Sequence, residues 1–291
     1  MKIIDTHVHL GDIYGLFDNF DIFDQKFKHS DRPSPYERLK FRNIYGGKLN
    51  YLFKPLIASS ARSMTRYANL PNLLQSMQKS GVSQSIVLAL EPFVKSDVIL
   101  NICQNNPSLI PFCSIHPLDR DKKEKIKRYV TAGAKGLKLH PVIQRILPDS
   151  LDTLELLEEV APYNIPVLYH VGWGSIGRGS YGMIDNYRKI LRSFPRMKFI
   201  FAHMGFYEPI PLLDMIENCP NVYCDTSWQP AGIIKKAIAK LGKDRIIFGS
   251  DWPYSLQQTS LNIILKLTED KPQLREKILH KNIERIISAG I

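Results

Sequence analysis

Short apolar, β-branched runs alternate with longer amphipathic segments along almost the whole chain. Eight such runs lie at residues 2–6, 84–90, 109–115, 134–139, 165–170, 198–202, 221–225 and 245–249. They are nearly continuously apolar, which is typical of parallel strands whose two faces are both covered. The segments between them, such as residues 70–79 and 151–163, carry apolar side chains at helical spacing. Eight strand–helix units predict an α/β fold, the (β/α)8 TIM barrel.

Two other architectures use the same kinds of segment. An open doubly wound sheet is the first, but no Gly-x-Gly-x-x-Gly pattern follows the first apolar run, which weighs against it. A pair of small domains is the second, because 291 residues allow either one large domain or two small ones. Right-handed parallel crossovers make one closed barrel the more economical topology. We therefore expect a single domain over residues 1–291.

A long insertion separates the first expected strand from its helix. It covers residues 11–66 and is rich in Phe, Tyr, Lys, Arg and Pro. The other 235 residues are close to the ~250 of a bare barrel. Loops that follow barrel strands lie at the catalytic face, so we expect this insertion to be a lid or a substrate-specificity element. The alternative is a solvated or oligomer-contacting excursion.

The strongly basic composition raises the question of a nucleic-acid partner. The formal net charge is +11 and the isoelectric point is about 9.4. However, no segment concentrates the lysines, and no RNA-binding or zinc-finger motif is present. The run at residues 122–128 is better explained as a solvated helix face. We expect a small-molecule substrate instead, with the surplus charge attracting an anionic one. Homodimer formation is left open.

The cysteine content, the length of the apolar runs and the first residues indicate a cytoplasmic protein without a membrane partner. Four cysteines in a chain of this length do not form a disulfide scaffold. No apolar run approaches the ~20 residues that a membrane span needs. The first residues, MKIIDTHVHLGD, carry histidines and aspartates where a signal peptide would be apolar.

Six side chains suited to metal or proton chemistry follow the ends of expected strands: His7, His9, His140, His170, His203 and Asp251. His7 and His9 are two residues apart, so they share one face of the first strand. Parallel barrel strands bring their carboxyl ends to one face, where all six should meet. Each one alone would more often be structural, but their coincidence indicates a site for a divalent metal, zinc first.

Several short motifs carry a family resemblance: DTHVH at residues 5–9, GLKLHP at 136–141, AHMG at 202–205, GSDWP at 249–253 and KNIER at 281–285. With them and His170, the chain resembles the amidohydrolase superfamily. The closest likeness is to its amidohydrolase-2 group, which includes aminocarboxymuconate-semialdehyde decarboxylase, related aromatic-acid decarboxylases and lactonases. The resemblance implies a TIM barrel with one metal ion, usually zinc.

The resemblance also implies roles for individual residues. His7, His9, His170 and Asp251 correspond to the metal ligands, and Asp251 also moves protons. His203 corresponds to a histidine that orients or activates water. These roles agree with general chemistry, because a metal lowers the pKa of bound water and a nearby carboxylate can take its proton. By position alone, Asp5 is a candidate acceptor that fixes the ring tautomer of a ligand.

Four residues are candidates for substrate binding. Lys138 and His140 are two apart and share a strand face, while Trp173 and Arg178 lie in a glycine-rich segment after His170. Lys138 would contact the substrate or form a buried ion pair; the alternative is the carbamate bridge of binuclear relatives. Arg178 could pair with a substrate carboxylate through two hydrogen bonds, and a solvated loop charge is its alternative.

Two reactions remain open for such a site. The first is hydrolysis of an amide, ester or lactone bond in a small, anionic molecule. The second is non-oxidative decarboxylation of an aromatic or unsaturated acid, with Asp251 protonating carbon. Both reactions use the same ligands, so the ligand spacing does not separate them.

Overall fold

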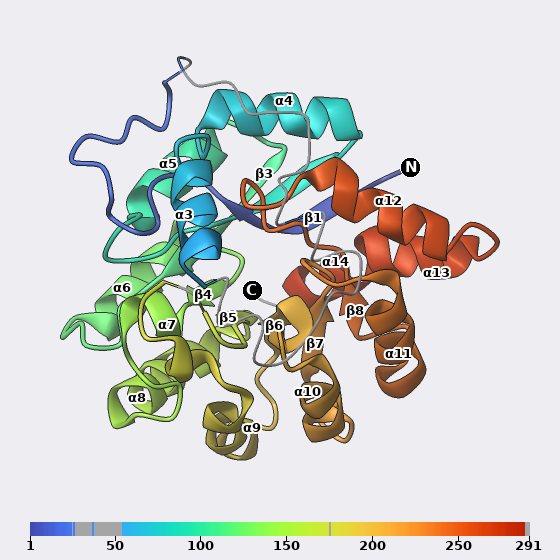
Figure 1. The fold of residues 1–291 in the computed structure, drawn as a ribbon. Coiled ribbons are helices and arrows are strands. Elements are labelled where there is room, and N and C mark those ends of the chain that lie inside the picture. Colours follow the sequence, from blue (N-terminus) through green and yellow to red (C-terminus); the bar gives the residue numbers. More distant parts are fainter. Residues whose placement is uncertain (25, 27–36, 38–53, 175, 289–291) are drawn as a thin grey trace.

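The computed structural model describes residues 1–24, 26, 37, 54–174 and 176–288 of the chain. Eight parallel strands pair in chain order and form a barrel (Figure 1). They are β1 (Ile4–His9), β2 (Gln84–Leu88), β3 (Leu109–Ser114), β4 (Leu137–Leu139), β5 (Val167–His170), β6 (Phe199–Ala202), β7 (Val222–Asp225) and β8 (Ile246–Ile247). Every expected strand is present, and the prediction of a (β/α)8 barrel is confirmed.

Backbone hydrogen bonds close the barrel between its first and last strands. The Thr6 amide donates to the Phe248 carbonyl at 3.0 Å, and the Asp251 amide donates to the His7 carbonyl at 2.8 Å. The His9 amide donates to the Trp252 carbonyl at 2.8 Å. These contacts exclude the open doubly wound sheet, and they join the segment after β8 directly to the two histidines of β1.

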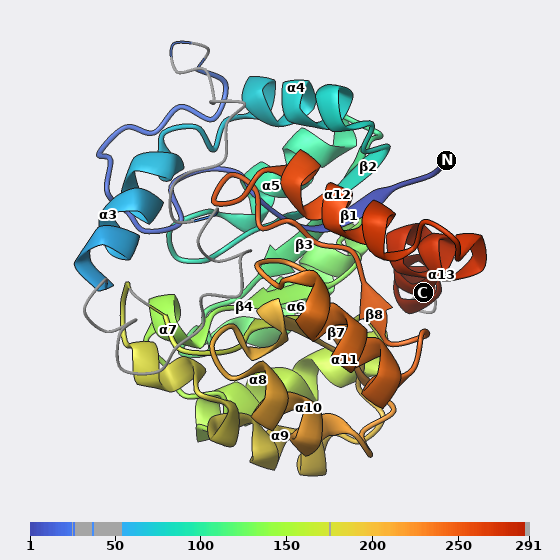
Figure 2. The ribbon, with the colours of Figure 1, turned by 45° about the vertical axis from the view of Figure 1, so that its right-hand side comes forward.

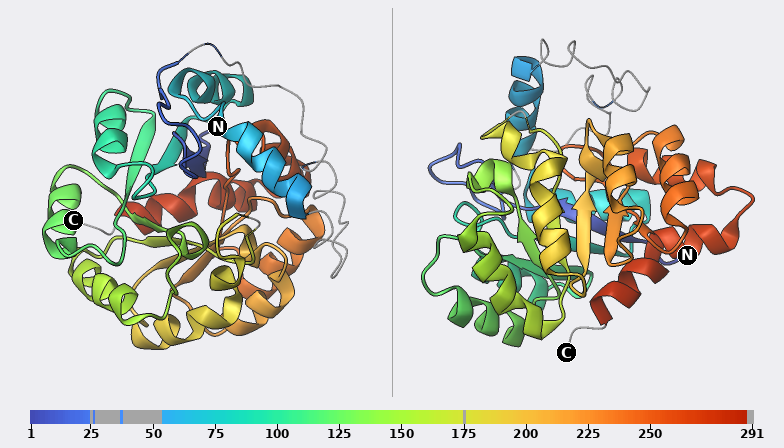
Figure 3. Two further views of the ribbon diagram at one scale, coloured as in Figure 1. Left: turned by 60° about the vertical axis from the view of Figure 1, so that its left-hand side comes forward. Right: turned by 90° about the horizontal axis from the view of Figure 1, so that it is seen from below.

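Most helices surround the barrel on its outside (Figure 2), while α3 (Lys54–Thr65) and α14 (Asn282–Ser288) lie at its two ends (Figure 3). The other helices are α4 (Leu70–Ser80), α5 (Ser96–Gln104), α6 (Lys122–Thr131), α7 (Pro141–Gln144), α8 (Leu151–Val160), α9 (Arg188–Ser193), α10 (Pro209–Ile216), α11 (Ala231–Leu241), α12 (Gln257–Leu267) and α13 (Pro272–Glu276). Their boundaries follow local chemistry: α4, for example, starts after the Asn69 cap and ends at Gly81, whose φ is 72°.

Apolar side chains fill the barrel interior below the site. Ten buried residues form this inner cluster: Ile4, Ile86, Leu88, Phe112, Leu168, Ile200, Ala202, Ile247, Ile283 and Ile286. The last two come from α14, which lies across the end of the barrel opposite to α3 (Figure 3). Burial of each large apolar side chain contributes about 1.5–3 kcal/mol. These side chains therefore fill the barrel interior and hold the strands in place.

A bulge in β1 decides which of its side chains face inward. Asp5 pairs with Ser85, but Val8 pairs with Val87, so the register shifts between them. As a result Ile4 lies in the inner cluster while Val8 packs in the outer layer between strands and helices. In a regular strand these two residues would share a face.

The described parts of the chain contain no helix with the length and apolar character needed to cross a membrane.

Candidate active site

Three of the expected metal ligands converge at the carboxyl end of the barrel. The Nε2 atoms of His7 and His9 lie 3.1 Å apart, and each is 3.3 Å from Oδ1 of Asp251. Together these residues offer ligand atoms within 4.8 Å of one another. All three side chains are buried. Burial and the charge of Lys138 lower the pKa of both histidines well below 6.5, so their rings are neutral.

His170 at the end of β5 lines the same cavity as these residues and lies beside His203. The two rings are inclined at 66° with centroids 5.1 Å apart. Burial lowers the pKa of His170 to about 3, against a hydrogen bond to the Gly172 backbone that raises it. Its Nε2 is buried and has no hydrogen-bond partner among the described residues. This nitrogen is thus left to bind a group from outside the chain.

His203 occupies the end of β6 in an unusual backbone conformation. Its φ is 60°, and φ is also positive at Met204 and Phe206. Such conformations cost about 1–3 kcal/mol for non-glycine residues and often mark functional sites. The Gln229 side chain holds this bend by donating to the His203 and Phe206 carbonyls. The His203 ring stacks on that of His7 with centroids 4.8 Å apart, and its Nε2 is 4.0 Å from Asp251.

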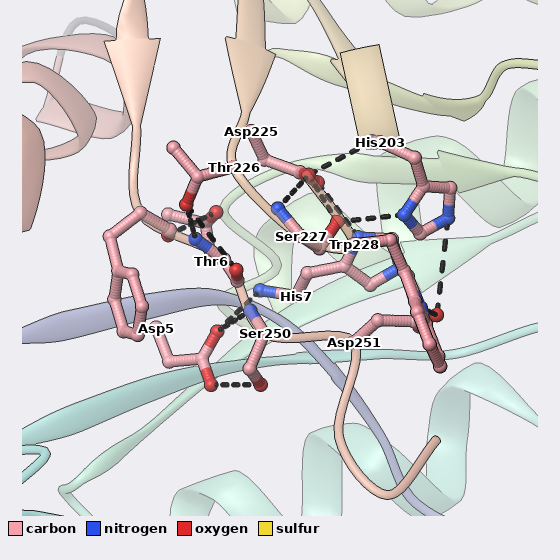
Figure 4. Close-up of polar contacts among 12 residues, drawn as sticks. Asp5, Thr6, His7, His203, Asp225, Thr226, Ser227, Trp228, Ser250 and Asp251 are labelled. Carbon is pink, nitrogen blue, oxygen red and sulfur yellow. Dashed lines mark hydrogen bonds and ion pairs between the residues drawn. The ribbon is translucent and has the colours of Figure 1, made fainter. Parts of the chain in front are cut away.

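Asp225, the last residue of β7, contacts two of these histidines (Figure 4). Its Oδ2 accepts from Nδ1 of His7 at 2.8 Å, and its Oδ1 accepts from the His203 amide at 2.9 Å. Oδ1 also accepts from the Ser227 amide at 3.0 Å and from the Ser227 hydroxyl. The Ser227 hydroxyl in turn lies 2.7 Å from Nδ1 of His203.

Asp5 does not have the expected contact with a ligand ring. It accepts from the amide and hydroxyl of Ser250 at 2.9 and 2.6 Å, from Gln257 at 2.8 Å and from the His7 amide at 3.1 Å. The bulge in β1 explains this, because it breaks the alternation that would place Asp5 on the same face as His7. Asp225 instead contacts the His7 ring.

Asp251 is held in a strained and desolvated position. Its φ is 68°, and the Trp228 indole N–H donates to its Oδ2 at 2.7 Å. Burial raises the pKa of Asp251 well above 3.8, while the Trp228 hydrogen bond and the Lys138 charge oppose that rise. Such a carboxyl group suits proton transfer near neutral pH.

Lys138 lies fully buried on β4 beneath the histidines. Within the described residues its Nζ has no hydrogen-bond partner. Burial lowers the pKa of Lys138 to about 8, against the charges of Asp251 and Asp225 that raise it. Its charge acts on the site electrostatically from below.

His140 follows β4 and lies against His170. The two rings stack with centroids 4.0 Å apart and an interplanar angle of 8°. Nδ1 of His140 accepts from the Ile143 amide at 3.4 Å, so the ring also caps α7. His116 follows β3 and bonds the Gln144 carbonyl through Nε2 at 3.0 Å, away from the other histidines.

An open cavity lies above these groups, and its empty space, counted out into open solvent, is about 750 Å³. Its walls are mainly aromatic or apolar and include Ile13, Tyr14, Met64, Ile143, Trp173, Ile176, Phe206, Trp228 and Tyr254. Five lining residues come from the insertion over residues 11–66, where α3 projects past the carboxyl ends of the strands (Figure 3). The rest of the insertion, residues 25, 27–36 and 38–53, lies outside the described residues, as does residue 175 of the glycine-rich segment.

The candidates for substrate binding fall in different places. Trp173 and His140 line the cavity. Lys138 lies below it and Arg178 is exposed, with Nη1 donating to the Tyr181 hydroxyl at 3.2 Å. Arg178 does not line the cavity as described, and its substrate contact stays a prediction.

Comparison with known proteins agrees with this geometry. A sequence model described as Amidohydrolase, that of the amidohydrolase-2 family, matches residues 4–288. The chain belongs to the amidohydrolase family. Its family and its candidate metal ligands make it a metal-dependent enzyme of this superfamily. Among curated proteins, none matches the chain.

Solved structures share the fold at low sequence identity. A TIM-barrel protein from Bordetella bronchiseptica is 18% identical, with a TM-score of 0.73 and 99% of each chain covered. The 5-carboxyvanillate decarboxylase from Novosphingobium aromaticivorans, complexed with manganese and 4-hydroxy-3-methoxy-5-nitrobenzoic acid, is 15% identical, with a TM-score of 0.70 and coverage of 99% and 96%. A probable 2-pyrone-4,6-dicarboxylic acid hydrolase from Acinetobacter baumannii is 14% identical, with a TM-score of 0.63 and coverage of 99% and 100%.

Proposed function

We propose that this amidohydrolase binds one divalent metal ion, zinc first, through His7, His9, His170 and Asp251. We further propose that it hydrolyses an amide, ester or lactone bond in a small molecule. The observation that carries the proposal is the position of Asp251 and His203 beside the ligand nitrogens. A carboxylate and an imidazole at that position are the groups that hydrolysis by activated water requires.

The residues present fit a metal ion. Nδ1 of His7 donates to Asp225, so Nε2 of His7 carries the lone pair that faces Nε2 of His9 at 3.1 Å. Two neutral imidazoles and a carboxylate oxygen within 4.8 Å offer lone pairs to one point. Nε2 of His170, which has no hydrogen-bond partner in the described part of the chain, adds a third nitrogen. Three nitrogens and one oxygen suit zinc, which would take water or substrate by expanding from four to five ligands.

The side chains around that point perform the proton transfers. When bound, a divalent cation there supplies Lewis acidity, which polarises a nearby oxygen and lowers the pKa of water. Asp251 is placed to take a proton and to pass it to the leaving group. His203, across the site, can hold the attacking water through Nε2. The Trp228 indole N–H keeps the Asp251 carboxylate oriented during both transfers.

The walls of the cavity suit a planar substrate. Trp173, Phe206 and Trp228 present indole and phenyl groups, and Tyr14 and Tyr254 add phenols from two different segments. We assign Trp173 and His140 to substrate binding, with Lys138 attracting negative charge from below and Arg178 approaching from the exposed loop. The insertion over residues 11–66 acts as a lid or specificity element of the same single domain.

The aromatic walls also favour a second candidate, non-oxidative decarboxylation of an aromatic acid. In that reaction Asp251 would donate its proton to the ring carbon that loses carbon dioxide. One manganese-containing structure with the same fold is a decarboxylase complexed with a planar, ring-containing benzoic acid. The metal ligands would be the same for either reaction.

Product identification separates the two candidates. The purified, metal-loaded enzyme is incubated with a panel of aromatic acids, lactones and amides, and carbon dioxide release is measured beside the appearance of new acid. Hydrolysis predicts new acid from a lactone, ester or amide, without carbon dioxide. Release of carbon dioxide from an aromatic acid, with no hydrolysis of the other compounds, would replace the first proposal by the second. Asp251→Asn should abolish either activity.

A further inference from the structure

Donor and acceptor can be assigned in only one way for the hydrogen bonds around Asp225. Its Oδ1 receives the backbone amides of His203 and Ser227 at 2.9 and 3.0 Å, and a backbone amide can only donate. Oδ1 is therefore an acceptor. The Ser227 hydroxyl, which also contacts Oδ1, must donate its proton there. None of these groups is exposed enough for water to take a partner's place.

The orientation of the Ser227 hydroxyl also determines which ring nitrogen of His203 carries the proton. Since the Ser227 hydroxyl proton points at Asp225, its oxygen faces Nδ1 of His203, 2.7 Å away, as an acceptor. Nδ1 of His203 must then carry the ring proton, which leaves the lone pair on Nε2. That nitrogen faces the cavity and lies 4.0 Å from Asp251. The other carboxylate oxygen of Asp225 sets His7 in the same tautomer.

We propose that Asp225 and Ser227 form a relay that fixes the tautomers of His7 and His203 together. Through it, both rings present the lone pair of Nε2 to the cavity. Nε2 of His203 in the resting enzyme is thereby a hydrogen-bond acceptor and not a donor. This inference rests on the proposed function only for its consequence, which is that His203 accepts a hydrogen bond from the attacking water while Asp251 takes its proton. Asp225 and Ser227 are positioning residues, since neither lines the cavity as described.

A second aspartate–serine pair provides a matched control. Asp5 accepts from the amide and hydroxyl of Ser250, as Asp225 does from Ser227, and all four residues are buried. The Ser250 hydroxyl, however, contacts no histidine ring in the hydrogen bonds described, and the Trp252 amide donates to it at 3.0 Å. Removal of either hydroxyl costs a similar buried hydrogen bond, but only the loss of the Ser227 hydroxyl should affect a ring nitrogen.

Nuclear magnetic resonance of the metal-free protein tests the relay. Long-range nitrogen–proton correlations of histidine rings show which nitrogen carries the proton. The His203 signals are assigned by their absence in His203→Gln. For the wild-type protein we expect a protonated Nδ1 and an unprotonated Nε2 at His203. Ser227→Ala should convert His203 to the other tautomer or to a mixture of both, while Ser250→Ala should leave its signals unchanged.

Two results would overturn the relay. One is a protonated Nε2 at His203 in the wild-type protein, and the other is an unchanged His203 tautomer in a folded Ser227→Ala protein. Ser227→Thr keeps the hydroxyl and should retain the wild-type tautomer, which separates the hydroxyl from a packing effect. Because the measurement uses neither metal nor substrate, its outcome is independent of whether the enzyme is a hydrolase. A failed activity assay would not affect the tautomer result. An unexpected tautomer would likewise not decide which reaction the enzyme catalyses.

Discussion

Two buried aspartate–serine pairs lie at β1, one of them including Asp5 of the strand itself, and they are built alike but connected differently (Figure 4). In each pair the aspartate accepts four hydrogen bonds, two of them from the serine. The inner pair, Asp225 and Ser227, contacts the rings of His7 and His203. The outer pair, Asp5 and Ser250, instead contacts Gln257 of α12. The same local chemistry thus contacts the His7 and His203 rings in one pair and joins the barrel to a helix in the other.

The largest difference between the pairs should follow removal of the negative charge. In Asp225→Asn the two backbone amides require the amide oxygen at the Oδ1 position, which turns the NH2 group toward Nδ1 of His7. His7 must then accept on Nδ1 and protonate Nε2, so it loses its lone pair for metal. We expect metal affinity to fall about 100-fold and kcat/KM to fall about 10²–10⁴-fold. Isothermal titration with Zn²⁺ and steady-state kinetics measure both effects.

Asp5→Asn is the control for that experiment. It makes the same replacement of a carboxylate oxygen by an amide nitrogen, but in the outer pair. It should alter metal affinity by less than about threefold, because Asp5 contacts no histidine ring nitrogen. Equal losses of metal affinity in the two variants would contradict the distinction between the pairs.

The outer pair should contribute its own pH-dependent part of the stability, which the Asp5→Asn comparison isolates. Burial raises the pKa of Asp5 from 3.8 to about 6, so the folded protein binds this proton more tightly than the unfolded chain does. The corresponding stabilisation is complete below pH 4 and is lost as the pH rises through 6. A shift of that size corresponds to about 3 kcal/mol. Between pH 4 and pH 7, the free energy of unfolding of the wild type, measured with urea, should fall by up to this amount relative to that of Asp5→Asn. A pH-independent difference between the two proteins would refute this.

Gly249 packs closely against Asp225 of the inner pair and against Thr6. A Cβ there would come 3.1 Å from both Cβ of Asp225 and Oγ1 of Thr6. Gly249→Ala should therefore cost about 1–3 kcal/mol in the free energy of unfolding. Gly232 in α11 has nothing within 4 Å of the same position, and Gly232→Ala should stabilise the protein by about 0.5–1 kcal/mol. Thermal unfolding of both variants checks the contrast, which fails if Gly249→Ala is as stable as wild type.

The smallest effect in this series should follow loss of the serine hydroxyls. We expect Ser227→Ala to lower kcat/KM about tenfold with metal affinity retained, because His203 keeps its place but loses its fixed tautomer. Ser250→Ala should lower the free energy of unfolding by about 1 kcal/mol without changing kcat/KM beyond about twofold. Kinetics and urea unfolding of the two variants give the comparison, and a larger kinetic effect for Ser250→Ala would reverse the assignment.

The sequence predicted the barrel and the gathering of its strand-end histidines because both depend on regular geometry. Parallel strands with apolar faces end at one side of the barrel, so His7, His9, His170 and His203 meet there however the loops run. Asp225 also ends an expected strand, but a single aspartate without a motif gave no reason to select it. Its position at the end of β7 was the available signal.

The placement of Asp5 could not be predicted, since a one-residue bulge in β1 reverses the face of every side chain before it. Nothing in the letters DTHVH marks that bulge. The tyrosine contacts in the cavity wall were equally inaccessible to sequence reasoning, although Trp173 was not. Tyr14 and Tyr254 are far apart in the chain, yet their rings lie 5.8 Å apart in the cavity. Contacts of this kind depend on how the segment around Tyr14 packs against the loop after β8.

Metal analysis of the purified protein tests the central claim most directly. Mass spectrometry of the wild-type chain, dialysed against metal-free buffer after loading with Zn²⁺, should find about one ion per chain. His7→Ala should lose the ion, while His116→Ala should retain it, because His116 also follows a strand end but bonds the Gln144 carbonyl. Absence of stoichiometric metal in the wild type, or full occupancy in His7→Ala, would contradict the proposed site.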